Sequence, residues 1–243
     1  MPLVCSLSLL GIVVASSLAL PIRAQMLGAP VLQNAFTNQG FTVGADFGAV
    51  KDVTSYGGAV AWSPANGVLQ LSGGVAYLHS KHASGTATYG ARLMVPVLDR
   101  TSAFGVAPFV GMGGANFDGV NDWQIPLGIS AGYRRAIGTN GRGISAYVSP
   151  FYTWARVRAN GQTETHGLFR VSAGVDAAVL PQVGVTVGYE GGQNAGDGEA
   201  GATGGIFGIG VSYSFHKPGT AAEADTPRAR TPRAESDSTD TTP

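Results

Sequence analysis

The sequence predicts an all-β fold, namely a closed, antiparallel, up-and-down transmembrane β-barrel of about ten strands, with a range of eight to twelve. Residues 205–215, GIFGIGVSYSF, alternate strictly between large apolar side chains and glycine or serine, which is typical of a strand with two unlike faces. Charged residues make up only 12% of the chain, about half of the ~25% usual in soluble domains. After the N-terminal segment no apolar run is long enough for a membrane helix, so any membrane crossing requires strands.

The alternation raises the question of which strand face meets water. One face carries Phe, Ile, Val and Tyr, whereas the other carries Gly, Ser, Thr and few charges. With the apolar face inward, the exterior would be nearly chargeless, which is unusual for a soluble protein. With the apolar face in lipid, small polar residues fill the interior, and barrel closure pairs backbone groups that otherwise cost several kcal/mol each. We therefore expect the apolar face to contact lipid.

The chain begins with an apolar segment. Residues 3–20, LVCSLSLLGIVVASSLAL, are followed by Pro-Ile-Arg-Ala and then Gln25. A short apolar core before a small residue is typical of a secretory signal peptide, so we expect export and cleavage between Ala24 and Gln25. The alternative is an uncleaved anchor, because the run approaches the ~20 residues that span a bilayer. Cys5 lies inside this segment, so the mature chain would contain no cysteine for disulfide or thiol chemistry.

From Phe41 onward the alternation recurs in segments that are near the ~9–11 residues a tilted transmembrane strand needs. The expected strands are 41–50, 56–63, 69–78, 87–95, 104–117, 123–134, 144–154, 168–179, 183–190 and 206–215. Pro108, Pro126 and Pro150 fall inside three of these segments, although a closed barrel has no edge strand to hold a proline. We expect that the regular strands begin at these prolines or that a bulge absorbs each one.

The connectors differ in character between the two ends of the predicted strands. SPANG, LDRTS, LPQ and the slightly longer IGTNGRG predict tight turns, whereas HSKHASG, FDGVND, ANGQTETHG and GGQNAGDGEAGATG predict longer loops at the other end. KDVTS is short for a loop on that second side. Aromatic residues at both strand ends predict two belts at the lipid–water boundaries. They are Trp62, Tyr133 and Phe215 on the turn side, and Tyr77, Tyr89, Trp123, Trp154 and Tyr189 on the loop side.

The polar face carries a small set of charges that we expect in the barrel lumen: Asp46, Arg92, Arg170, Asp176 and Glu190. The LPQ turn places residue 179 near residue 183, so Ser172 lies opposite Glu190. Arg170 is then the diagonal neighbour of Glu190 on the inward face, within reach for long side chains. We hypothesise an Arg170–Glu190 ion pair as part of a lumen charge network with Asp46, Arg92 and Asp176. The alternative is that each charged group points toward loop water.

The segments APFVGMGGANF, FRVSAGVDAAVLPQVGVTVGYE and GVSYSF resemble small bacterial outer-membrane β-barrel proteins of the OmpA-like, porin-like kind. The resemblance covers roughly residues 40–215 and implies a bacterial outer-membrane location. It also implies that a final strand ending in Phe215, with Tyr213 before it, is the signal read by the barrel-assembly machinery. In this family the signal Phe usually ends the chain, whereas here a tail follows.

The expected organisation is a signal peptide over 1–24, a periplasmic segment over 25–39, the barrel over 40–215 and a tail over 216–243. The tail is poor in apolar residues and rich in Ala, Thr, Pro and mixed charge, which predicts a disordered periplasmic extension.

Patterns that would support catalysis or metal binding are weak. His82 and Ser84 form a His-x-Ser pair that resembles outer-membrane lipases and lipid A deacylases, but no orienting carboxylate or Asn follows at the required distance. His79 and His82 lie in a predicted loop, where solvated histidines are commoner than metal ligands. FDGVND lacks the spaced, Glu-closed pattern of an EF-hand. We predict no enzymatic activity, no cofactor and no metal.

A barrel this narrow has its interior mostly filled by side chains. The predicted function is therefore a structural or surface-interaction role, or passage of very small solutes. The expected partners are outer-membrane lipid and, through the last strand, the barrel-assembly machinery. A formal net charge of zero gives no indication of nucleic-acid binding. The alternatives are a lipid-modifying barrel enzyme that uses His82 and Ser84, and a secreted soluble β-protein.

Overall fold

A computed structural model gives the fold. The described residues are 34–50, 53–81, 85–98, 102–117, 120–137, 142–159, 161–193 and 205–215. The expected signal peptide over 1–24 and the tail over 216–243 lie outside these ranges, as does most of the segment over 25–39.

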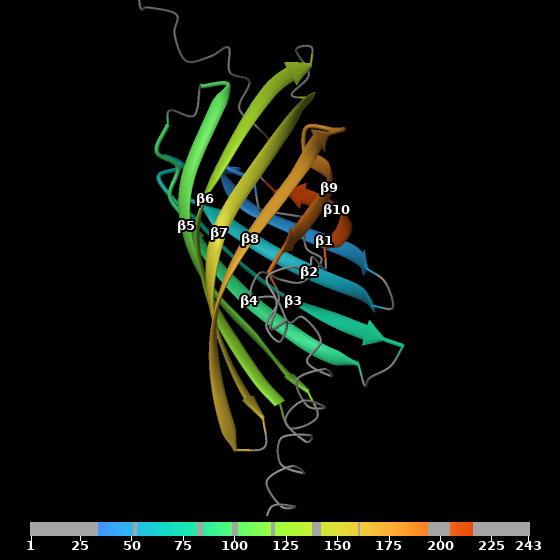
Figure 1. Cartoon of the computed structure of the whole chain (residues 1–243). Coiled ribbons are helices and arrows are strands. Elements are labelled where there is room, and N and C mark those ends of the chain that lie inside the picture. Colours follow the sequence, from blue (N-terminus) through green and yellow to red (C-terminus); the bar gives the residue numbers. More distant parts are fainter. Residues whose placement is uncertain are drawn as a thin grey trace, which may run out of the picture.

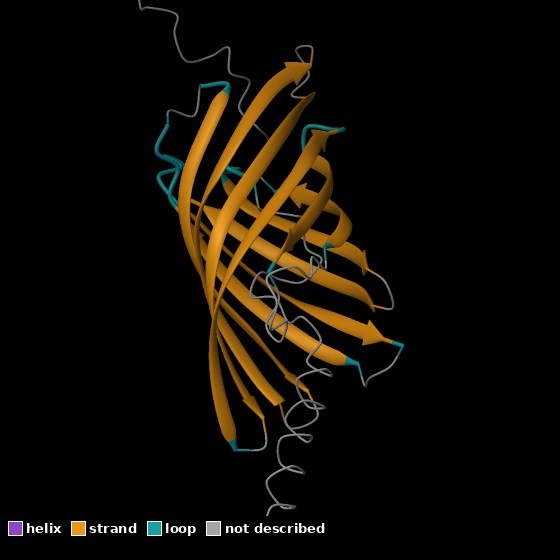
Figure 2. Ribbon diagram, in the orientation of Figure 1, coloured by secondary structure: helices purple, strands orange, loops and turns teal. Residues whose placement is uncertain are grey.

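Ten strands run through the described residues, and all of them are seen in Figure 1 and Figure 2. They are β1 Gly40–Val50, β2 Val53–Ser63, β3 Gln70–Ser80, β4 Thr86–Met94, β5 Phe104–Phe117, β6 Val120–Ile137, β7 Arg142–Ala159, β8 Gln162–Ala178, β9 Val183–Gly192 and β10 Ile206–Ser214. No described segment forms a helix that is long and apolar enough to cross a membrane.

The strands close into a single up-and-down barrel. Each strand pairs antiparallel with its neighbours in sequence, and the circle closes where β1 pairs with β10, for example at Ala45 opposite Val211. The predicted fold class and strand number are therefore confirmed. Figure 1 shows neighbouring strands running side by side, with β5–β8 crossing in front of β1–β4 at a steep angle.

The two faces of each strand have the polarity that the alternation predicts. On β1, Phe41 and Phe47 are exposed at 55% and 40%, whereas Thr42 and Asp46 between them are buried at 2% and 7%. On β10, Phe207, Ile209, Val211 and Tyr213 are exposed, and Gly208 and Gly210 are buried. The apolar face therefore covers the exterior, as lipid requires.

Aromatic side chains surround the barrel at both ends of the apolar band. Trp62, Tyr133 and Phe215 are exposed at one end, as are Tyr77, Tyr89, Trp154 and Tyr189 at the other. Trp123 is partly exposed and packs edge-on against Trp154, with ring centroids 5.7 Å apart. The outward positions of these rings match the predicted belts.

The connectors differ from the prediction because the strands run further than the apolar alternation does. β6, β7 and β8 have 18, 18 and 17 residues, and most residues of FDGVND and ANGQTETHG belong to the hairpins β5–β6 and β7–β8. Of the predicted connector KDVTS, only residues 51–52 lie between β1 and β2. Backbone pairing needs no apolar side chains, so polar sequence continues the ladder. The expectation of long loops at these places was wrong, and the β7–β8 hairpin instead projects to the lower end of Figure 1.

The expectation that strands begin or bulge at the three prolines was also wrong. Around Pro126 the pairing of β5 with β6 keeps one register, with Val110 opposite Leu127 before it and Gly113 opposite Gln124 after it. Around Pro150 the register of β6 with β7 is likewise unchanged. Each proline removes a local bond, because it has no N–H, without shifting the register.

The third proline, Pro108, lies inside β5 next to the end of β4. Its carbonyl oxygen still accepts a hydrogen bond from the Val95 N–H at 3.0 Å. The regular pairing of β4 with β5 stops beside this proline, at Met94 opposite Phe109. Beyond the proline the same register continues, because the Val97 N–H donates to the Val106 carbonyl at 2.9 Å.

We predict that a charge on the lipid face of β6 destabilises the barrel according to its depth. Leu127, which is 63% exposed, lies in the middle of the apolar band, and Ile137, which is 56% exposed, ends the same strand on the same face. Leu127→Arg should lower the free energy of unfolding by about 2–4 kcal/mol, and Ile137→Arg by about 0–1 kcal/mol. Denaturant unfolding in lipid vesicles measures both. Equal effects of the two changes would contradict the assigned exterior.

Candidate functional site in the barrel interior

The barrel interior is filled unevenly around its wall. Strands β9, β10, β1, β2 and β3 present many glycines inward, among them Gly188, Gly210, Gly44, Gly57 and Gly74. Strands β4–β8 present most of the large buried side chains, among them Met94, Phe109, Gln124, Tyr147, Phe151, Leu168 and Arg170. Leu78 of β3 and Ile206 of β10 form a second, smaller buried cluster on the other half. Large residues on one half of the wall therefore occupy the space that small residues leave on the other half.

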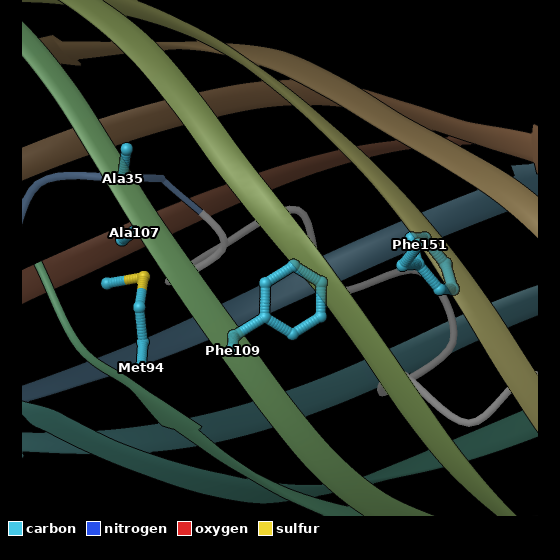
Figure 3. Close-up of a cluster of buried hydrophobic side chains, with 5 residues drawn as sticks. All are labelled: Ala35, Met94, Ala107, Phe109 and Phe151. Atoms are coloured by element: carbon cyan, nitrogen blue, oxygen red, sulfur yellow. The ribbon is translucent and has the colours of Figure 1, made fainter. Parts of the chain in front are cut away.

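An apolar cluster occupies the lumen where the large side chains meet. It contains Ala35, Met94, Ala107, Phe109 and Phe151, all at most 3% exposed. The rings of Phe109 and Phe151 lie 6.2 Å apart between centroids, and Figure 3 shows them side by side. This packing depends on Gly128, because a Cβ there would lie 2.5 Å from the Cβ of Phe151 and 2.8 Å from the Phe109 ring.

The short segment before β1 enters the lumen and binds its wall. The Asn34 amide donates a hydrogen bond to Ser145 Oγ at 2.6 Å and another to the Asp176 carboxylate. Asp176 also accepts from the Thr186 hydroxyl. Two residues further on, the Phe36 ring lies 4.7 Å below the Arg134 guanidinium. Residues 34–36 thus fill the interior at the end of the barrel where β1 starts.

The predicted ion pair between β8 and β9 is present in the lumen. Ser172 pairs with Glu190 across the two strands, and the Arg170 Nε–H donates to Glu190 Oε1 at 3.0 Å. Arg170 Nη2 is also 3.0 Å from that oxygen, and Nη1 donates to the Gln193 carbonyl at 2.9 Å. The side chains are only 2% and 7% exposed, so this is a buried, multiply bonded pair.

The remaining predicted lumen charges also point inward, but Asp46 lies apart from the others. Asp46 is 7% exposed, and neither of its carboxylate oxygens has a hydrogen-bond partner in the described part of the chain. It fits there because Gly57 faces it, and a Cβ on Gly57 would lie 2.7 Å from its oxygens. The Arg92 guanidinium instead stacks 3.6 Å from the Phe109 ring centroid, a cation–π geometry. The hypothesis of one network that includes Asp46 was therefore wrong.

The proposed assembly residues lie where the barrel closes. Phe215 follows β10 directly, is 63% exposed, and donates its backbone N–H to the Phe41 carbonyl at 2.9 Å. Tyr213, two residues earlier on the same outward face, packs edge-on against it at 5.2 Å. Both rings are thus available at the outer surface of the closing strand.

Other predicted positions lie outside the described residues: Ala24 and Gln25 at the expected cleavage site, and His82 and Ser84 of the weak catalytic pair. His79 is described, and it is exposed on the outward face of β3. Within the ranges given above, no group of three or more His, Cys, Asp or Glu residues is arranged to hold a metal ion.

Sequence reasoning missed the large apolar side chains inside the barrel. On β5 the lipid face follows Phe104, Val106 and Pro108, so Phe109 falls in the inward register. Phe151 on β7 breaks the small polar face in the same way. An oversized apolar residue among inward positions was the available signal. Nothing in the sequence indicated that Asn34 and Ala35 would meet these strands.

No family model matches the sequence, and no curated protein matches it. Solved structures with a similar fold include the β domain of the Bordetella autotransporter BrkA, with 13% identity and a TM-score of 0.47 over 72% of this chain and 98% of that one. Others are Neisserial surface protein A, with 18% identity and 0.36 over 73% and 98%, and the KdgM porin, with 12% and 0.38 over 72% and 99%. These likenesses concern barrel architecture and not function.

The geometry of the chain itself defines its class. It is a closed antiparallel barrel with apolar side chains and two aromatic belts on its exterior. Its interior holds glycine, hydroxyl groups, buried charge and one apolar cluster. This inside-out polarity is that of an outer-membrane β-barrel.

We predict that the Arg170–Glu190 pair contributes strongly to barrel stability. Glu190→Gln leaves the Arg170 charge without its carboxylate in a buried site, so the free energy of unfolding should fall by about 3–5 kcal/mol. The control is Glu164→Gln, which removes the exposed contact of Glu164 with His166 at 3.4 Å and should change it by at most about 1 kcal/mol. Denaturant unfolding measures both variants. A Glu190→Gln midpoint equal to wild type would contradict burial.

Proposed function

We propose that this protein is a bacterial outer-membrane β-barrel with a structural or surface-interaction role, and that its lumen passes at most very small solutes. The outer face supports the membrane location. Val75, Met112 and Leu127 are each more than 60% exposed, and a contiguous apolar exterior of this kind is unfavourable in water.

The proposal that the lumen passes at most very small solutes rests on its filled interior. Phe109, Phe151 and Arg170 are at most 3% exposed inside the barrel, and residues 34–36 occupy one of its ends. Porins that conduct freely keep an aqueous channel, whereas narrow barrels are closed by their own side chains. The interior therefore supports a scaffold or surface role over a general pore.

An even number of up-and-down strands places the start of β1 and the end of β10 at the same side of the membrane. We place that side in the periplasm, with the hairpins β5–β6 and β7–β8 projecting outside. These hairpins extend beyond Trp123 and Trp154 and end in polar residues such as Asn121 and Thr163. They form the surface that is available for interaction with the cell's surroundings.

Export and assembly complete the proposal. Cleavage between Ala24 and Gln25 would release the mature chain into the periplasm. The last strand, with Tyr213 and Phe215 on its outer face, would then be bound by the barrel-assembly machinery, as the family resemblance implies. The tail over 216–243 would extend into the periplasm from the completed barrel.

We predict that the wild-type barrel shows no large conductance in planar lipid bilayers and that enlarging its interior raises the conductance. Phe109→Ala combined with Phe151→Ala removes two rings from the lumen cluster. The matched control is Phe104→Ala combined with Phe169→Ala, which removes two lipid-facing rings that are 63% and 52% exposed. Only the interior pair should add conductance. Large, stable wild-type current steps would contradict the filled lumen.

We predict that Phe215→Asp impairs assembly. It removes an exposed ring that packs on Tyr213 and places a charge at the belt, in addition to any loss of recognition. Deletion of residues 216–243 should leave a folded barrel, because β10 and its pairing with β1 are complete before them. Heat-modifiable gel mobility of outer-membrane fractions reports both outcomes. Normal assembly of Phe215→Asp would remove this residue from the proposed signal.

A further inference from the structure

A pair of arginines lies on the outer surface of the barrel, directly beyond the loop-side aromatic belt. Arg156 and Arg158 are exposed residues of β7, and both fall in the outward register that contains Trp154. Arg156 is two residues past Trp154, a distance of roughly 7 Å along a strand. Across the ladder it pairs with Trp123, the other ring of the Trp pair. The guanidinium groups therefore begin where the lipid-facing aromatic surface ends.

Polar donors surround this pair on the same face. Arg156 is opposite Thr165 and Arg158 is opposite Thr163 on β8, and Asn121 of β6 lies on the other side of Arg158. Thr163, Thr165 and Asn121 are all exposed. We call this set the arginine patch, defined as Asn121, Arg156, Arg158, Thr163 and Thr165.

Carboxylates are segregated from the arginine patch by the strand alternation. Among the described residues of β5–β8 at this end, Asp122 and Glu164 both lie in the inward register. The outward face at the same level holds no Asp or Glu within that described part. Arg156 and Arg158 make no hydrogen bond or ion pair with a described residue. The patch is therefore an uncompensated positive surface beside the membrane.

The chemistry that fits this surface is a lipid phosphate. A guanidinium binds phosphate oxygens through two parallel charge-assisted hydrogen bonds, and arginine is favoured over lysine for this purpose. Two arginines at a two-residue spacing present two such forks about 7 Å apart, and the threonine hydroxyls supply further donors. The tryptophan pair next to them is of the kind found where headgroups meet acyl chains.

We propose that the arginine patch binds the phosphate groups of the phosphorylated glycolipid of the outer leaflet, lipopolysaccharide. This inference rests on the proposed outer-membrane placement with the β5–β6 and β7–β8 hairpins outside. That placement puts the patch at the headgroup level of the outer leaflet, where the phosphates of this lipid lie. Binding fixes β7 and β8 against the membrane surface.

The test uses the full mature barrel, folded in a neutral detergent, with purified lipid A as the probe. Lipid A carrying its phosphates should raise the midpoint of heat-induced unfolding in a saturable manner, because it binds the folded state. Arg156→Gln combined with Arg158→Gln should weaken apparent binding on the order of tenfold to thirtyfold, since each arginine near a lipid surface contributes about a fivefold factor. The matched control is Arg135→Gln, an exposed, outward arginine of β6 at the opposite membrane boundary. It should bind like wild type.

Three further probes distinguish the sources of phosphate. Lipid A without phosphates and free inorganic phosphate should each leave the unfolding midpoint unchanged. An equal shift with phosphatidylglycerol would overturn the assignment to glycolipid, and an equal loss in Arg135→Gln would overturn the assignment to the patch. Failure of the free protein to show heat-modifiable mobility would instead refute the proposed barrel, so the two failures are distinguishable.

Discussion

One constraint shapes the whole structure: every backbone N–H and C=O within the water-free core of the bilayer needs a hydrogen-bond partner in the protein. Closure between β1 and β10 meets this need, because every strand then has a partner strand on both sides. The same requirement explains how the prolines are placed. Pro126 and Pro150 each remove one N–H from a ladder whose register is otherwise unbroken, so the loss stays local. At Pro108 the carbonyl still accepts a hydrogen bond from the Val95 N–H, so the ladder lacks only the bond that a backbone N–H at this position would make.

With the backbone satisfied by closure, the side chains solve two opposite packing problems. The exterior needs apolar surface without charge, whereas the interior must be filled although β9, β10 and β1–β3 present many glycines to it. Large residues from β4–β8 reach across to the glycine side, and Gly128 and Gly57 leave the space that Phe151 and Asp46 occupy. The charges differ in how well they are compensated. Arg170 and Glu190 are bonded to each other, whereas Asp46 has no hydrogen-bond partner among the described residues.

Much of this architecture could be predicted from the sequence, because period-two alternation reports directly on a sheet with lipid on one face. The pairing of Ser172 with Glu190 followed from the tight turn at residues 180–182 alone. The ends of the long strands could not be predicted, since Gln162 and Thr163 carry no apolar pattern and pair only through the backbone. The contact of Asn34 with Ser145 and Asp176 joins residues more than 100 positions apart. No local pattern encodes such a contact.

The lumen position of residues 34–36 has a mechanical consequence. Asn34 is six residues before β1, the strand that closes the barrel by pairing with β10. It is nevertheless bonded to β7 and β8 on a distant part of the wall. The segment therefore links the β1–β10 pairing, where the barrel closes, to strands β7 and β8 across the lumen. Separation of β1 from β10 would strain the hydrogen bonds of Asn34 to Ser145 and Asp176. These bonds therefore oppose both flattening of the barrel and its opening between β1 and β10. In a barrel without such a segment, the backbone hydrogen bonds between the first and last strands alone hold those two strands together.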